Sequence, residues 1–169
     1  MITVYVRRIL PRAQRAHDAE HQTAWALLAD VVQKEHGKAL CDLPLAYTEH
    51  GKPYFADNFL YFSLSHTKTL AVLAIGDAPC GVDAEAQSRH ISAAVRARFL
   101  PDLPPDAPNE VAVAAWTARE AYGKMTGEGL LTAQVSVPPD VQLQSLFAYR
   151  HIITVCAKTG QIAKDIIAF

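Results

Sequence analysis

Apolar residues recur along the chain with two spacings that predict different elements. Leu28 and Val32 belong to a set of apolar residues three or four positions apart, which predicts an amphipathic helix over residues 18–36. A second helix is predicted over residues 91–100. Alternating or continuous apolar runs predict strands at residues 3–10, 45–47, 59–64, 72–75, 134–137, 142–149, 152–157 and 162–168. The mixture indicates an α+β fold.

Residues 110–126 form the most clearly bounded helix of the sequence. Asn109 follows Pro108 as a candidate N-cap, and Gly127 suits the left-handed position that ends a helix. The proline-rich segment before Asn109 cannot continue a helix, so the start is well defined. We therefore expect one regular helix with a distinct inner face.

One face of this helix carries a tryptophan, a carboxylate and an amine. Trp116, Glu120 and Lys124 recur at i, i+4 and i+8 and therefore share a face. Trp116 is expected to pack in the core. Taken alone, Glu120 and Lys124 are best interpreted as a surface ion pair. An acidic segment further upstream changes that interpretation.

Residues 81–85 read Gly-Val-Asp-Ala-Glu and follow a buried strand. In extended chain, Asp83 and Glu85 point to the same side. Together with Glu120 they would form a cluster of like charges that is unfavourable unless a proton or a cation neutralises it. Mg²⁺ prefers such oxygen ligands. The sequence therefore predicts a divalent-metal site with Lys124 beside it.

Four motifs occur in a recognisable order: Gly51-Lys52-Pro53, then residues 62–67 (Phe-Ser-Leu-Ser-His-Thr), then residues 81–85, then residues 116–130. In this order they resemble the 4′-phosphopantetheinyl transferases of the surfactin-synthetase-activating type, over roughly residue 49 to the end of the chain. The resemblance implies one compact unit of two similar α+β halves packed as a pseudo-dimer. The halves would be approximately residues 1–80, on the nucleotide side, and residues 81–169, with the metal and catalytic groups.

The resemblance also implies an activity. Relatives transfer 4′-phosphopantetheine from coenzyme A to a serine hydroxyl of an apo acyl or peptidyl carrier protein, releasing 3′,5′-ADP, and act as holo-[acyl-carrier-protein] synthases. The implied cofactor is Mg²⁺, with Mn²⁺ as an alternative. The resemblance assigns Asp83, Glu85 and Glu120 to the metal, and Asp83, Glu120 and Lys124 to catalysis.

Coenzyme A would be bound by residues of three motifs. The resemblance assigns Gly51, Lys52, Pro53, Ser65, His66 and Lys124 to this role. Where relatives often carry an arginine in their first long helix, this chain has Trp25. The contact to the 3′-phosphate of coenzyme A would then fall to Arg15, His17 or His21.

Three positions within the motifs depart from the family pattern. Ser63 stands for the usual asparagine, Thr67 for the usual serine and Arg119 for the commoner lysine. Ser63 and Thr67 keep a hydrogen-bonding side chain, and Arg119 keeps the charge with a different geometry. The hydrogen-bonding capacity and the positive charge of the family motif are therefore retained at these three positions.

Composition limits the remaining possibilities. The chain has 169 residues and a net charge of −1, which gives no general attraction to nucleic acid. Its three cysteines are widely spaced and predict neither a disulfide framework nor a zinc site. No apolar segment has the length of a membrane span. We expect a cytoplasmic protein, and a site completed within one chain favours a monomer.

Three alternatives stand beside the transferase interpretation. A non-catalytic relative that binds coenzyme A and recognises a carrier protein would be expected to lack a metal ligand, but the acidic residues and Lys124 are present. Another Mg²⁺-dependent phosphodiesterase or nuclease would leave His66 and the Gly51-Lys52-Pro53 motif unexplained. A purely structural domain would leave four ordered motifs to coincidence.

Overall fold

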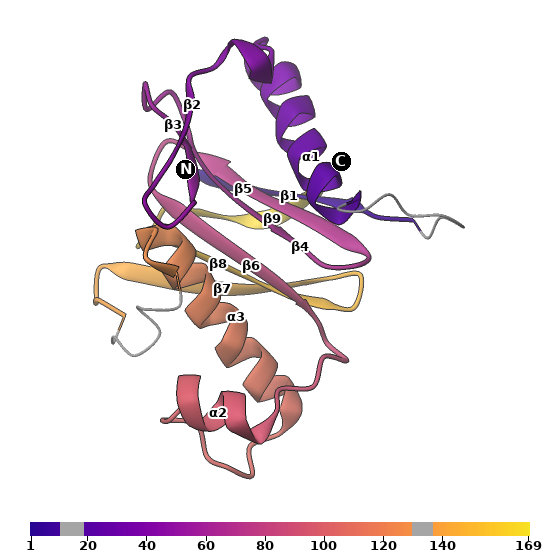
Figure 1. The fold of residues 1–169 in the computed structure, drawn as a ribbon, viewed down its shortest axis with the longest axis vertical. Helices are drawn as coiled ribbons and strands as arrows, with labels where there is room; N and C mark the ends of the chain where they lie inside the picture. Colours follow the sequence, from indigo (N-terminus) through magenta and orange to yellow (C-terminus); the bar gives the residue numbers. More distant parts are fainter. Residues whose placement is uncertain (11–18, 130–136) are drawn as a thin grey trace.

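The protein is built on two sheets that share one apolar core, with a helix on the outer face of each (Figure 1). The computed structural model describes residues 1–10, 19–129 and 137–169. The first sheet has the strand order β4-β5-β1-β9. Its strands are β1 (Ile2–Arg8), β4 (Tyr61–His66), β5 (Leu70–Gly76) and β9 (Ile162–Ala168). They are antiparallel except for β9, which pairs with β1 in parallel.

The second sheet is fully antiparallel and has the order β6-β8-β7. Its strands are β6 (Cys80–Ala86), β7 (Val141–Ala148) and β8 (His151–Lys158). Alternate residues of these strands, such as Val82 and Val155, meet residues of β1 and β5 in the core between the sheets. Because strand side chains alternate, the other residues of β6 face away from this core, toward the helix beyond it.

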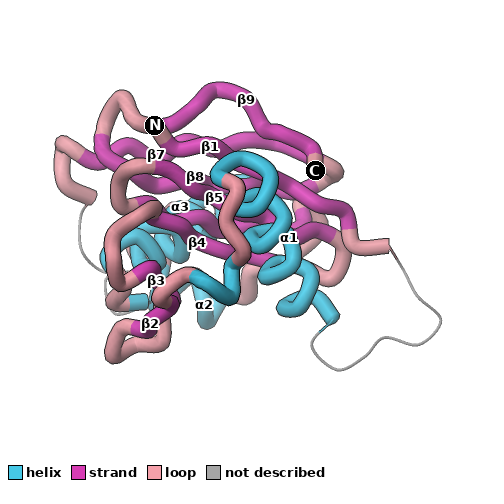
Figure 2. Tube along the Cα trace, turned by 90° about the horizontal axis from the view of Figure 1, so that it is seen from above, coloured by secondary structure: helices cyan, strands magenta, loops and turns pink. Residues whose placement is uncertain are grey.

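The helices cover the outer faces of the sheets. Helix α1 (Ala19–His36) packs on the first sheet, as Figure 2 shows from above. Its apolar stripe is buried against this sheet. Helix α3 (Asn109–Thr126) packs on the second sheet. Helix α2 (Ala93–Phe99) packs beside the first half of α3. A short hairpin, β2 (Leu45–Tyr47) and β3 (Pro53–Phe55), follows the 3-10 turn Leu40–Asp42.

The two sheets share one connection pattern. In the first, β1-α1-β4-β5 gives the spatial order β4-β5-β1; in the second, β6-α3-β7-β8 gives β7-β8-β6. Strand β9 then extends the first sheet beyond β1. The C-terminal strand therefore lies with the first half of the fold, although in sequence it belongs to the second.

The predicted elements within the described residues are present, with shifted ends. The strand β3 was not predicted, and the start of α3 needs a correction. The helix begins at Asn109, and Pro108 precedes it. Asn109 is not the N-cap, because its side chain ties down the preceding loop: Oδ1 accepts from the Ile91 N–H (3.1 Å) and Nδ2 donates to the Arg89 carbonyl (2.7 Å). Gly127 ends the helix with φ 81°, as predicted. The strand predicted at residues 134–137 falls almost entirely outside the described residues.

Among the described helices, none has the length and apolar character needed to cross a membrane.

Candidate functional site

Two serines join the neighbouring edges of the sheets and bring two of the sequence motifs together. Strand β4 lies at the edge of the first sheet and β6 at the edge of the second. The Ser63 hydroxyl accepts from the Val82 N–H (3.0 Å), and the Ser65 hydroxyl accepts from the Ala84 N–H (3.2 Å). Both serines are buried. These bonds satisfy edge N–H groups of β6 and hold residues 62–67 against residues 81–85.

A cleft of about 530 Å³ opens beside this junction, between α1 and α3. It adjoins a smaller cavity of about 240 Å³, with which it shares Gly51, Pro53, Leu64 and Lys124, so the two form one groove. Side chains from both halves line the larger part: His21, Trp25, Ser65, His66, Asp83, Glu85, Arg89, Trp116, Glu120 and Lys124. Lys52 lines the smaller part. The residues predicted for the metal, for catalysis and for coenzyme A therefore lie along one groove.

Asp83 lines the larger part of this groove. It is buried, and its Oδ1 accepts from Lys124 Nζ (2.8 Å) and from the Ser65 hydroxyl (3.0 Å). Its Oδ2 is also buried and has no hydrogen-bond partner within the described part of the chain. A buried carboxylate oxygen without a partner is costly, so this atom is an unused acceptor at the site.

Glu120 lies half-buried on the same side of α3 as Lys124 and Trp116. Burial raises the pKa of Glu120, and the nearby Asp83 carboxylate raises it further, whereas Lys124 and Arg89 oppose the shift. The Asp83 carboxylate therefore disfavours the charged form of Glu120.

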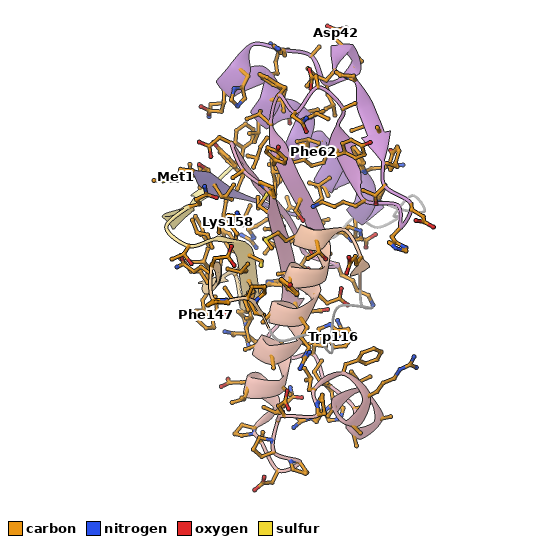
Figure 3. The ribbon with its side chains drawn as sticks, turned by 90° about the vertical axis from the view of Figure 1, so that its left-hand side faces the viewer. Met1, Asp42, Phe62, Trp116, Phe147 and Lys158 are labelled. Carbon is orange, nitrogen blue, oxygen red and sulfur yellow. The ribbon has the colours of Figure 1, made fainter. Side chains whose placement is uncertain are left out.

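Glu85 is neutralised by a residue that the motifs did not single out. Arg89 forms an ion pair with Glu85, and its guanidinium lies over the Trp116 ring, 5.4 Å from the centroid. Trp116, which Figure 3 labels on α3, is buried, as predicted. Its ring packs edge-on against Phe99 of α2. The only sequence signal for Arg89 was its spacing of four residues from Glu85, which does not by itself indicate contact outside a helix.

Two of the predicted metal ligands have oxygen atoms whose chemistry suits a divalent cation. Asp83 offers an unpartnered oxygen, and Glu120 is a second carboxylate whose charge a cation would stabilise. The described residues contain no group of three His, Cys, Asp or Glu side chains that could hold a metal ion. Glu85 pairs with Arg89, and Asp83 pairs with Lys124. Asp83 and Glu120 are thus the best-suited pair, and Glu85 would first have to leave Arg89.

Two histidines line the opposite wall of the cleft. The rings of His66 on β4 and His21 on α1 are 6.0 Å apart, and Trp25 donates its indole N–H to His21 Nε2 (2.9 Å). Partial burial lowers the pKa of His66, with His21 and Lys124 adding to the effect and Glu20 and Asp83 opposing it. His21 is the one of the three predicted 3′-phosphate candidates that lies within the described residues; Arg15 and His17 lie outside them.

Lys52, which lines the smaller part of the groove, joins the hairpin that carries it to the end of α3 and the start of β6. Its ammonium donates to the carbonyls of Met125 (3.0 Å) and Cys80 (3.3 Å), at the end of α3 and the start of β6. Burial lowers the pKa of Lys52, and the neighbouring thiols of Cys80 and Cys156 oppose the shift. Its flanking residues, Gly51 and Pro53, line both parts of the groove. The lysine therefore has a structural role in addition to any ligand contact.

The comparisons with known proteins bear on the same family. No family model matches the chain. The chain is similar to the 4′-phosphopantetheinyl transferase HetI of Nostoc sp. strain PCC 7120, with 29% identity over 72% of this chain and 59% of the relative. It therefore spans less than two thirds of that relative's length. The similarity supports the 4′-phosphopantetheinyl transferase superfamily.

Proposed function

We propose that this protein transfers 4′-phosphopantetheine from coenzyme A to a serine hydroxyl of an apo acyl or peptidyl carrier protein, as a holo-[acyl-carrier-protein] synthase. The observation that carries the proposal is the buried Asp83, which lies with Lys124 and Ser65 where the two halves meet. The similarity to a phosphopantetheinyl transferase over 72% of the chain is an independent support.

We assign the protein to the two-half, monomeric, surfactin-synthetase-activating type. The support is the repeated connection pattern, in which β1-α1-β4-β5 and β6-α3-β7-β8 produce the same strand order. A pseudo-dimer of this kind completes its groove within one chain, since α1 and β4 supply one wall and β6 and α3 the other. No second copy is needed for the residues assigned here.

The chemistry is a displacement at the phosphorus that carries the pantetheine arm. The carrier serine oxygen forms a bond to this phosphorus, and the bond to the bridging oxygen of the pyrophosphate breaks, so that 3′,5′-ADP leaves with the electron pair. The proton of the serine hydroxyl passes to the Glu120 carboxylate. In the metal-free chain, burial and Asp83 raise the pKa of Glu120. A carboxylate placed in this way can act as a general base.

The charges of the groove suit the phosphates of coenzyme A. Lys124, on the wall facing His66, would bind the transferred phosphate and stabilise the negative charge that develops on it. His66, with His21 beside it, would bind a further phosphate of the nucleotide, and Gly51 and Pro53 would contact the nucleotide portion. Ser65 keeps Asp83 oriented through its hydrogen bond.

Asp83 and Glu120 would hold the metal ion, with Glu85 as a third ligand once released from Arg89. A bound Mg²⁺ supplies electrostatic stabilisation of the pyrophosphate oxygens.

The test is a mass spectrum of an apo carrier protein after incubation with this protein, coenzyme A and Mg²⁺. We expect a phosphopantetheine-sized gain on the carrier serine that EDTA prevents. Glu120→Gln keeps the shape of the side chain and removes the base and the charge, so it should lower the rate by about 100-fold or more. Asp106→Asn in the exposed loop before α3 is the matched control and should act at the wild-type rate.

Two outcomes would contradict the proposal in different ways. If several carrier proteins gain no mass while calorimetry shows that coenzyme A binds, the protein is a coenzyme-A-binding module without transferase activity. If coenzyme A does not bind at all, the assignment of the groove to coenzyme A is wrong.

A further inference from the structure

A buried histidine that lies far from the motifs in sequence contacts the turn that follows His66. His151 is the first residue of β8, pairs with Ala86 of β6, and has 4% of its surface exposed. Its Nε2 lies 3.0 Å from the Thr67 hydroxyl and 3.2 Å from the Thr69 hydroxyl. Thr67 directly follows His66 in the chain, so a residue of the second sheet is bonded to the turn that presents His66 to the cleft.

The tautomer of His151 follows from its hydrogen-bond partners. Its Nδ1 lies 2.7 Å from the Tyr149 carbonyl, which can only accept, so Nδ1 carries the hydrogen. In the neutral ring, Nε2 is then an acceptor, and the threonine hydroxyls donate to it. The ring is therefore fixed at both nitrogens.

The Thr67 hydroxyl is fully used in this arrangement. Its oxygen accepts from the N–H groups of Thr69 (3.2 Å) and Leu70 (3.1 Å), and its hydrogen goes to His151. The backbone adds a further bond, because the Thr67 N–H donates to the Leu70 carbonyl (2.8 Å). Removing the hydroxyl would leave two N–H groups of the β4–β5 turn without their acceptor, and His151 Nε2 would keep only the longer contact to the Thr69 hydroxyl.

The other end of the contact is rigid as well. Tyr149 and Arg150, which precede His151, both adopt the left-handed conformation, with φ of 49° and 62°. Two successive residues of this kind make the tight turn that joins β7 to β8. The Gln87 N–H donates to the Arg150 carbonyl (2.9 Å), which ties this turn to the end of β6. His151 thus projects from a well-fixed base.

We propose that His151 is a positioning residue that clamps the β4–β5 turn through Thr67 and thereby fixes the imidazole of His66 in the wall of the cleft. The consequence for coenzyme A rests on the proposed function, whereas the placement of His66 does not. His151 itself lines neither part of the groove, so its effect on a ligand is carried by the turn.

The chain offers a matched set of substitutions to test this clamp. Thr67→Val keeps the shape of the side chain and removes the hydroxyl, and Thr67→Ser restores the hydroxyl. Thr154→Val makes the same chemical change at a buried threonine of β8 that bonds Thr117 (2.8 Å) and Ser145 (3.3 Å). Within the described part of the chain, neither bond of Thr154 reaches the β4–β5 turn. His151→Leu removes the clamp from the other side. Thr67→Val and Thr67→Ser keep the test decisive if His151→Leu fails to fold.

The first readout is the pKa of His66, measured from the NMR signals of its ring protons as the pH is varied. These signals are assigned by their loss in a His66→Gln variant. In the wild type this pKa is lowered by partial burial, His21 and Lys124, against Glu20 and Asp83. We expect Thr67→Val and His151→Leu to move it toward the value of an exposed histidine. Thr67→Ser and Thr154→Val should leave it at the wild-type value.

The second readout is the dissociation constant for coenzyme A, measured by calorimetry. Loss of an ordered His66 should raise it about tenfold in Thr67→Val and His151→Leu, and by less than about twofold in Thr67→Ser and Thr154→Val. An unchanged pKa of His66 in folded Thr67→Val overturns the clamp. If the wild type binds no coenzyme A, the proposed function fails, and the pKa of His66 still decides the clamp.

Discussion

At the scale of single residues, the two buried serines of β4 have different tasks although they look alike in sequence. Each accepts an N–H from β6, Ser63 from Val82 and Ser65 from Ala84. Only Ser65 also donates to Asp83 Oδ1, at 3.0 Å. Ser65 therefore both joins the sheets and orients the carboxylate on which the proposed chemistry depends.

This difference gives a prediction for Ser63→Ala and Ser65→Ala. Each substitution leaves one edge N–H of β6 unpaired, so both should lower the free energy of unfolding, measured in urea, by about 1–3 kcal/mol. Ser65→Ala also removes a donor from Asp83 and should slow phosphopantetheine transfer, by about tenfold for a lost hydrogen bond to a charged group. Equal transfer rates for the two variants would show that Ser65 acts only as a sheet connector.

The residues that carry charge could be predicted from the sequence, but their partners could not. Residue spacing within one strand and one helix is local information, and it predicts the faces on which Asp83, Glu120 and Lys124 lie. The Ser65–Asp83 bond, the Arg89–Glu85 pair and the His151–Thr67 contact each join segments whose meeting depends on how the sheets pack. The sequence therefore indicated the proposed chemistry without the groups that hold it in place.

At the scale of elements, the contact between α3 and β6 depends on a missing side chain. A Cβ atom on Gly81 would overlap the Ala121 carbonyl oxygen and come within 2.5 Å of the Met125 nitrogen. Gly81 lies in the motif next to Asp83, and its close approach brings the helix that bears Glu120 and Lys124 onto the strand that bears Asp83. The glycine is thus required for the distance between these elements.

Gly81→Ala should accordingly be among the most damaging small substitutions. The backbone atoms that it meets cannot move aside as a flexible side chain can, so we expect a loss of about 3 kcal/mol in the free energy of unfolding and reduced transfer activity. Gly160→Ala is the matched control: its Cβ meets nothing within 4 Å, and its φ of 81° gives a penalty of about 1–2 kcal/mol from conformation alone. A smaller loss at Gly81 than at Gly160 in urea unfolding would contradict this account.

The ends of elements were predictable where local chemistry decides them. Gly127 ends α3 because the left-handed conformation favours glycine. Asn109 was a reasonable N-cap by residue type, yet its side chain is used by Ile91 and Arg89 in a loop nearly twenty positions earlier. A tertiary contact therefore overrode a local preference.

At the scale of the whole molecule, the fold depends on pairings that a one-dimensional pattern does not contain. The mixture of helices and strands was predictable, whereas the return of β9 to pair with β1 was not. Two similar α+β halves were expected from the family resemblance, but the residues of the two halves show no repeat in sequence, because different side chains form each core. The two sheets pack against each other through one apolar core, to which Val4, Val72, Val82 and Val155 contribute.

A buried thiol reports on that shared core. Cys80 lies within it, and burial raises the pKa of its thiol from 9.0 to about 12; Lys52 opposes the shift and Cys156 adds to it. Because the pKa is higher in the folded state, the thiol's contribution is fully present below pH 9 and is lost as pH rises toward 12. The slope in that window is about 1.4 kcal/mol per pH unit for one thiol.

Urea unfolding at pH 8 and at pH 10.5 would measure this effect. The free energy of unfolding of the wild type should fall from pH 8 to pH 10.5. Cys156, whose pKa is also raised to about 12, acts in the same direction as Cys80. The lowered pKa of Lys52 partly offsets the effect of the two thiols. Cys80→Ala should reduce the loss by about 2 kcal/mol, the value of 1.5 pH units of titration. Cys41→Ala, at an exposed position, should leave the loss unchanged. If Cys80→Ala and Cys41→Ala lose as much stability as the wild type, Cys80 ionises without unfolding, and the core between the sheets is open to water at that strand.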